Sequence, residues 1–329
     1  MKIYLNKFYL ILSAALIFTS CSKINNQTDI NKNDNTSGKV NNSVDKNSIT
    51  SAGVKENGVE FKVEYNSPRN VYKIEKEDLN NDGNKELIVL SILKDTINKF
   101  NYYFKFDMIE IFALNDVKTK YEKIFSDTVD YSDTCIFQSL ANNNLKQILI
   151  LTNAGGNDPI SSEGMFVFNM SNNSKIYLVK YFEGGAPYID SINQDGKKQV
   201  IVQDRYWGVM PRSESIVYES EINEFENDSL KVKNSEFGEF YDKKIKVLKE
   251  KYYGSKKKSE MGMQPNDMSF PLYREACEVI VNYFAKEDMK GLGSFWNEES
   301  SFLKSKLPPD EFTDINNFVF KALPSAKNV

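Results

Sequence analysis

Oxygen-bearing side chains stand at alternate positions around a glycine between residues 78 and 86, in the sequence DLNNDGNKE. Hard cations prefer oxygen ligands, and a tight glycine turn lets the chain wrap around them, so this spacing predicts a calcium site. Position twelve, where an EF-hand has a bidentate Glu, is Val89, which excludes an EF-hand. A metal-free acidic turn is the alternative, because Asn and Asp favour turns by themselves. The expected ligands are the side chains of Asp78, Asn80, Asp82 and Glu86 and the backbone carbonyl of Asn84.

A second candidate surface combines an arginine with aromatic side chains. Arg205, Tyr206 and Trp207 are consecutive, and we group them with the glycine-rich stretches 154–158 and 183–187. Aromatic rings beside arginine suit stacking on a sugar ring or on a peptide side chain, whereas packing of the Trp at a strand end is the alternative. No segment reads G-x-x-x-x-G-K-S/T, so none of the glycines predicts a phosphate-binding loop.

Histidine is absent from the 329 residues, which excludes Ser-His-Asp and Cys-His catalysis and histidine-ligated zinc. The three cysteines are too few for a four-cysteine metal site. Cys135 and Cys277 stand among apolar neighbours and are predicted to be buried free thiols, with a disulfide as the alternative. A net charge of -4 gives no sign of a nucleic-acid-binding surface, so no nucleic-acid partner is expected.

The first twenty residues have the order of a secretory signal. Lys2 and Lys7 precede an apolar run from Phe8 to Phe18, which is shorter than the roughly 18 to 20 residues of a membrane-spanning helix. Two small residues then lead to Cys21, and this end resembles the lipobox of bacterial lipoproteins, with Phe18 where the family usually has Leu. The resemblance implies acylation of Cys21, cleavage before it, and a lipid anchor in the membrane. An unmodified cysteine behind a plain secretory signal is the alternative.

Residues 22–57 are rich in Asn, Lys, Ser, Thr and Asp and contain no aromatic residue. Such a segment buries too little apolar surface to fold, so residues 21–57 are predicted to be a disordered tether behind the lipidated cysteine. The abundance of Asn, Lys and Ile favours an AT-rich genome and a Gram-positive source. We therefore expect the protein at the outer face of the cytoplasmic membrane.

Residues 58–253 are predicted to be a β domain, because short apolar runs alternate with polar turns. A loop-plus-strand pattern recurs in this region at positions 78, 139 and 191, which are 61 and 52 residues apart. Spacings of this size are typical of units that hold about four strands. The clearest predicted strands are Glu86–Leu93, Phe106–Leu114, Gln147–Thr152, Gly164–Met170, Lys175–Phe182 and Ser215–Ile222.

This pattern resembles the FG-GAP and VCBS-type repeats of β-propellers, whose acidic D-x-D/N-x-D-G-x-x-D/E loop leads into a hydrophobic strand. The first copy keeps the full pattern, and the second copy has lost nearly all the oxygen ligands. The third keeps Asn193, Asp195 and Gly196 but has Ser191 and Gln199 at the outer positions. Three units are fewer than the four to eight blades of a closed propeller. We therefore expect propeller-like antiparallel four-stranded units that do not form a standard closed ring.

The hydrophobic period changes to that of helices after residue 239. Tyr241, Ile245, Leu248 and Tyr252 predict the buried face of an amphipathic helix at the end of the β domain. Residues 254–264, with the lysines at 256–258, are predicted to be a solvated linker, and contact of these lysines with anionic lipid or wall polymer is the alternative. Residues 265–329 are predicted to be a small helical domain, with helices from Leu272, over Ser294–Lys306 and after Pro308-Pro309.

These features favour a lipid-anchored surface module that binds a ligand, such as a cell-wall glycan or a protein partner, and that calcium stabilises. Carboxylate-based glycoside hydrolysis is the alternative function, because paired carboxylates need no histidine. A transporter-linked solute receptor is a third possibility, against which the lack of alternating strands and helices argues. No catalytic residue is assigned, and binding is favoured over catalysis.

Overall fold

The structure is a computed structural model, and all the residues that it describes belong to one compact unit, Asn47–Val329. The signal segment, Cys21 and the tether before residue 50 lie outside the described residues, as does Trp207. None of the helices in the described part of the chain is long and apolar enough to cross a membrane. The structure describes residues 50–56, 59–65, 69–93, 104–115, 117, 120–156, 158–171, 173–193, 195–206, 217–262 and 269–323.

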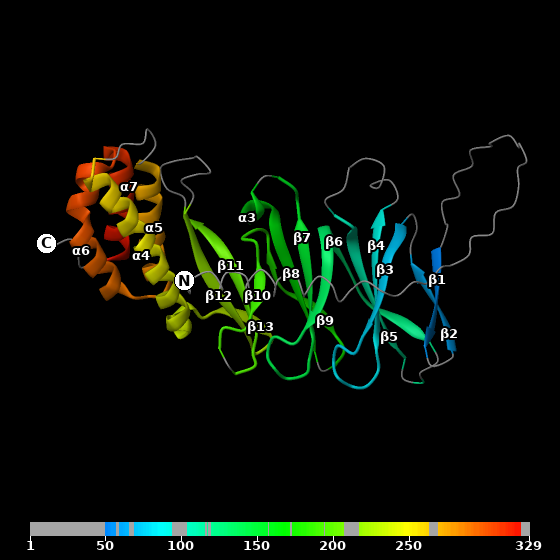
Figure 1. Cartoon of the computed structure of the whole chain (residues 1–329). Coiled ribbons are helices and arrows are strands. Elements are labelled where there is room, and N and C mark those ends of the chain that lie inside the picture. Colours follow the sequence, from blue (N-terminus) through cyan, green and yellow to red (C-terminus); the bar gives the residue numbers. More distant parts are fainter. Residues whose placement is uncertain are drawn as a thin grey trace, which may run out of the picture. The chain divides into compact units, whose positions relative to one another are not determined.

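Antiparallel strands make up most of the described chain before residue 233 (Figure 1). β1 (Thr50–Glu56) and β2 (Val59–Tyr65) form a hairpin, so the end of the predicted tether is a strand. The remaining strands form a seven-stranded and a four-stranded sheet in chain order. The first contains β3 (Arg69–Glu77), β4 (Glu86–Leu93), β5 (Phe106–Leu114), β6 (Tyr121–Gln138), β7 (Gln147–Asn153), β8 (Glu163–Met170) and β9 (Ile176–Phe182). The second contains β10 (Tyr188–Asp190), β11 (Gln199–Tyr206), β12 (Val217–Glu226) and β13 (Ser229–Val232).

The 18-residue strand β6 divides the larger sheet into two parts. Its beginning pairs with β5 and its end pairs with β7, and Tyr131 between them has a positive φ of 57°. This φ lies outside the β region, and the pairing register with both β5 and β7 shifts close to Tyr131, so the regular strand is interrupted there. We call residues 69–130, 131–182 and 188–232 the first, second and third β segments. Each holds four antiparallel strands in chain order, and neither sheet is closed within the described residues.

The β segments pack face to face because side chains alternate along each strand. One face of a segment shares a hydrophobic cluster with the segment before it, and the other face shares a cluster with the element after it. This alternation explains why consecutive apolar residues in one strand belong to different cores. Ile88 and Ile148 belong to the first of these shared clusters, Leu149 and Val200 to the second, and Ile201 and Tyr241 to the third.

Helix α4 (Gly238–Glu260) follows the short helix η2 (Asn234–Phe237) and buries the face predicted from sequence. Tyr241 and Ile245 pack on the third β segment, whereas Leu248 and Tyr252 belong to the helical core. The predicted linker is therefore wrong up to Glu260, because α4 continues through it and contributes to both cores. Met261 and Gly262 form a turn, and the last two residues of that linker, 263 and 264, lie outside the described chain.

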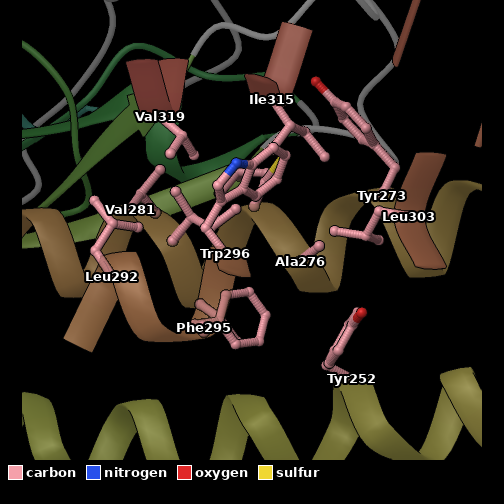
Figure 2. Close-up of a cluster of buried hydrophobic side chains, with 14 of the residues drawn as sticks. Tyr252, Tyr273, Ala276, Val281, Leu292, Phe295, Trp296, Leu303, Ile315 and Val319 are labelled. Carbon is pink, nitrogen blue, oxygen red and sulfur yellow. The ribbon is translucent and has the colours of Figure 1, made fainter. Parts of the chain in front are cut away.

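Three further helices complete the helical part: α5 (Ser269–Ala285), α6 (Met289–Lys306) and α7 (Pro309–Ala322). In Figure 2, Tyr252 of α4 faces Phe295 of α6, and their ring centroids are 5.4 Å apart. α6 begins five residues before the predicted Ser294, because the Asp288 carboxylate caps it by accepting a hydrogen bond from the Gly291 N–H at 2.8 Å. The predicted α7, with proline in its first turn, is confirmed.

Candidate functional site

In the predicted calcium loop, backbone N–H groups donate hydrogen bonds to the side-chain oxygens that were expected to bind the ion. Both carboxylate oxygens of Asp78 accept hydrogen bonds, from the N–H of Asp82 at 3.1 Å and of Gly83 at 3.0 Å. Asp82 Oδ1 accepts from the N–H of Asn84 at 2.7 Å, and Asn80 Oδ1 accepts from the N–H of Asp82 at 3.1 Å. The loop therefore closes on itself through Asx turns.

Glu86 closes the base of this loop. Its Oε2 accepts a hydrogen bond from the Leu79 N–H at 2.9 Å, and the residue is only 2% exposed. Burial, and to a smaller extent the negative charges of Asp82 and Asp78, raise the pKa of the Glu86 carboxyl to about 7, against the lowering effect of the Leu79 hydrogen bond. A buried carboxyl with neighbouring negative charges favours either its neutral form or a nearby cation.

The other two loops close in the same way without a carboxylate at this position. Gln147 Oε1 accepts from the Leu140 N–H at 2.8 Å, and Gln199 Oε1 accepts from the Ile192 N–H at 3.0 Å. Both glutamines are fully buried, as is Leu140, whereas Ile192 is partly buried. Glu86 therefore has a structural role that the ligand interpretation missed, and the glutamines at the aligned positions are the signal that could have revealed it.

The turn conformations also agree among the loops. Asn81 and Asn142 have φ values of 57° and 54°, and Gly83, Asn144 and Gly196 have φ values of 84°, 64° and 80°. In the second loop, Asn143 Oδ1 accepts from the Leu145 N–H at 3.2 Å, and in the third, Asp195 Oδ1 accepts from the Lys197 N–H at 3.0 Å. These bonds correspond to the one that Asp82 makes in the first loop. The pattern detected in the sequence thus corresponds to one backbone geometry.

The structure brings the predicted ligands into one loop, but it does not gather them around a point. Among the described residues there is no group of three acidic, cysteine or histidine side chains arranged to hold a metal ion. The donor chemistry suits a hard cation, since three carboxylates and an amide oxygen lie within nine residues. Each of these four side chains accepts at least one hydrogen bond, so a cation would have to replace such bonds.

A cleft of about 530 Å³ lies between the second and third β segments. The glycine-rich stretch 183–187 crosses from one segment to the other at its rim, where the Gly185 carbonyl accepts from the Gln203 N–H at 2.8 Å. Lys180 projects into the cleft over the Phe182 ring, 4.4 Å from its centroid. The polar side chains that line the cleft are those of Ser161, Lys180, Glu183, Gln203 and Glu221.

This cleft adjoins the predicted aromatic surface only in part. Arg205 and Tyr206 lie at the end of β11, two and three residues beyond Gln203, and Trp207 lies outside the described residues. The side chains of Arg205 and Tyr206 are not described, so their stacking role stays a prediction.

Cys135 and Cys277 are free thiols, as predicted. Cys277 is 2% exposed, whereas Cys135 is only partly buried by its accessible surface. Burial raises the pKa of both thiols, so neither is activated as a thiolate at neutral pH. Comparison with known protein families, curated proteins and solved structures finds no match to this chain.

Proposed function

We propose that the chain is a lipid-anchored extracytoplasmic module that binds a polar glycan or peptide ligand in the cleft between the second and third β segments. Lipid anchoring rests on Cys21 behind the signal-like apolar run, and a propeller-like identity of the segments rests on their common loops and layered packing. The cleft is the observation that supports ligand binding most directly. Its polar side chains come from both β segments, and the apolar side chains of Ile160, Phe182 and Val202 line it as well.

The charges in the cleft favour a ligand with both donor and acceptor groups. The Lys180 ammonium lies 2.9 Å from Asn223 Oδ1 and 3.4 Å from Glu221 Oε1, so it is fixed within the cleft. Glu183 is exposed at the rim and offers a carboxylate that is not needed for this network. Sugar hydroxyls and peptide amides match such alternating donors and acceptors.

Binding is tested with the chain carrying Cys21→Ala, applied to glycan and peptide arrays. Glu183→Ala should weaken each true interaction roughly tenfold, because it removes a charge-assisted hydrogen bond worth about 1.5 kcal/mol. The matched control is Glu122→Ala, since its side chain is 53% exposed on β6 of the first β segment. Equal loss in both variants, or no hit on either array, contradicts ligand binding in this cleft.

Lipid anchoring requires a separate measurement. Wild-type protein expressed with its signal segment should partition into detergent and membrane fractions, and Cys21→Ala should be released into the soluble fraction. Equal partitioning of the two proteins contradicts the anchor.

Calcium stabilisation of the first loop is part of the same proposal. Extracellular modules bind calcium with dissociation constants of about 10⁻⁴ to 10⁻³ M, and at ten times that concentration the ion stabilises the fold by about 1.4 kcal/mol. Asp82→Ala and Asp195→Ala remove the same Asx-turn hydrogen bond from equivalent loops. Both should lower stability in chelator, but only Asp82→Ala should abolish the stabilisation by calcium. If several millimolar calcium leaves the melting temperature of the wild type unchanged, the proposed calcium site is contradicted.

Hydrolysis is a second candidate function because two carboxylates, Glu183 and Glu221, line the same cleft. Glycosidases use such a pair as acid and as base or nucleophile. Glu221 is engaged by Lys180 and by the side-chain amide of Asn223 at 3.0 Å, which favours a fixed acceptor over a proton donor. Each glycan that binds should therefore be assayed for cleavage, and turnover that Glu221→Gln abolishes would establish the hydrolase.

A further inference from the structure

Consecutive loops are joined by two interactions that recur along the β segments. At the first junction, the Lys146 N–H donates to the Leu79 carbonyl at 3.0 Å, and the Lys146 ammonium pairs with the Glu77 carboxylate. Lys146 belongs to the second loop, and its two partners flank the start of the first loop.

The second junction repeats both interactions. The Lys198 N–H donates to the Leu140 carbonyl at 3.0 Å, and the Lys198 ammonium donates to Gln138 Oε1 at 2.9 Å. Each loop thus offers a carbonyl and a side-chain oxygen to the lysine of the next loop. We call these two interactions together a loop junction.

The third loop has the acceptor groups of a loop junction without a lysine of a following loop, and the first loop has the lysine without the acceptors of a preceding loop. In the third loop, Asp190 and Ile192 take the positions of Glu77 and Leu79, and no described residue donates to the Ile192 carbonyl. In the first loop, Lys85 takes the position of Lys146, and its side chain is exposed. No described residue accepts a hydrogen bond from the backbone N–H of Lys85. The Lys85 carbonyl faces inward, where it accepts from Tyr121 Oη at 3.2 Å.

The acceptor end opens into a cleft of about 1010 Å³. One wall is the start of the third loop, residues 190–193, and the opposite wall is α4 and the residues before it, with Lys243 and Lys251 beside Glu236 and Glu239. A first loop placed here would bring its Lys85 to Asp190. The first loop and the Asp190 wall therefore match in charge, whereas the opposite wall carries charges of both signs.

We propose that a second copy of this chain inserts its first loop into this cleft, where Lys85 of one copy forms a third loop junction with Asp190 and the Ile192 carbonyl of the other. The two surfaces are different parts of the same chain, so the contact is heterologous and continues head to tail.

Helix α4 limits how much of the second copy can dock. Tyr241 and Ile245 already cover Ile201 and Ile222, so no further β segment can stack on that face. The contact is confined to the first loop of one copy and the cleft of the other, so we expect it to bury less than the 1,200 to 2,000 Å² of stable interfaces. Association should therefore be weak, and salt should weaken it further because exposed charges carry it.

Sedimentation equilibrium of the Cys21→Ala chain in chelator, from micromolar to about millimolar concentration, tests this inference. The parent should self-associate, and Asp190→Lys or Lys85→Asp should each weaken association at least tenfold by placing like charges together. Mixing these two variants should restore heterodimers, because Lys85 of the first meets Asp190 of the second. Lys257→Asp, an exposed change near the end of α4, should associate like the parent.

The mixture separates a lost junction from a lost fold, since misfolded variants would not recover association together. Urea unfolding of each variant provides an independent check. A parent that stays monomeric throughout the range overturns the proposal. It is also overturned if both variants associate like the parent, or if their mixture stays monomeric.

Discussion

Three consecutive lysines, Lys256, Lys257 and Lys258, lie near the end of α4, and the first differs from the other two in its contacts. Lys256 reaches back across the helical core, and its ammonium lies 2.7 Å from Glu299 Oε2. The Glu299 side chain is fully buried and also accepts from Tyr252 Oη at 2.7 Å. Lys257 and Lys258 are exposed. Substituting each lysine by Met therefore compares a buried ion pair with two solvated charges in the same sequence context.

Removing one partner of a buried ion pair typically destabilises a protein by 3 to 5 kcal/mol, because the other charge stays buried without compensation. Here the Lys256 side chain is 22% exposed, and Tyr252 still donates to Glu299 after the substitution. Both facts place the effect at the lower end, so Lys256→Met should reduce the free energy of unfolding by about 3 kcal/mol. The corresponding changes at Lys257 and Lys258 should stay within about 0.5 kcal/mol.

Urea unfolding followed by circular dichroism measures these differences directly. The double variant Lys256→Met/Glu299→Gln should recover about 2 kcal/mol, because glutamine keeps the acceptor for Tyr252 and carries no charge. If Lys256→Met and Lys257→Met unfold at the same urea concentration, the ion pair is absent in solution. The lysine run would then be the solvated linker that the sequence predicts.

Three further substitutions test other parts of the fold. Burial raises the pKa of the Glu311 carboxyl from 4.5 to about 7, so the folded state binds this proton more tightly than the unfolded state. The free energy of unfolding should therefore fall as pH rises between these two values. In urea unfolding, Glu311→Gln should be stabilising by up to about 3 kcal/mol at pH 8 and neutral near pH 4. Gly185→Ala should lower the melting temperature, because φ is 89° and a Cβ would lie 2.3 Å from Val202 Cγ1. Trp296→Ala should cost about 3 to 5 kcal/mol of unfolding free energy, since the ring is buried and stacks on Phe312 at 5.8 Å.

Local periodicity was sufficient to predict the four long helices α4 to α7 but not all of their ends. The spacing of Tyr241, Ile245, Leu248 and Tyr252 identified the buried face of α4, because core packing selects one stripe of a helix. The end of α4 escaped prediction because Lys256 finds its partner 43 residues later in the sequence. Contacts at such separation leave no local signal, and a lysine-rich segment then resembles a linker.

Strands that lack continuous apolar runs were also missed. β3 and β6 are polar along much of their length and partly exposed, so their sequences show neither alternation nor a hydrophobic run. Pairing with the apolar strands β4, β5 and β7 fixes them in the sheet. The sequence showed the recurring loop, the apolar strands and a spacing that suits about four strands, whereas tertiary pairing decides which segments are the remaining strands of each β segment.

The recurring loop shows why ligand spacing does not by itself identify a metal site. The oxygens that would bind a cation at Asp78, Asn80 and Asp82 are the same atoms that accept backbone N–H groups in an Asx turn. Gln147 and Gln199 close their loops with neutral amides, so this backbone geometry does not require a cation. The first loop differs from the other two in charge, because it alone has a glutamate, Glu86, at the closing position together with two aspartates. A cation would therefore act by relieving that repulsion, and its contribution should disappear when one aspartate of the first loop is removed, while the turn itself remains.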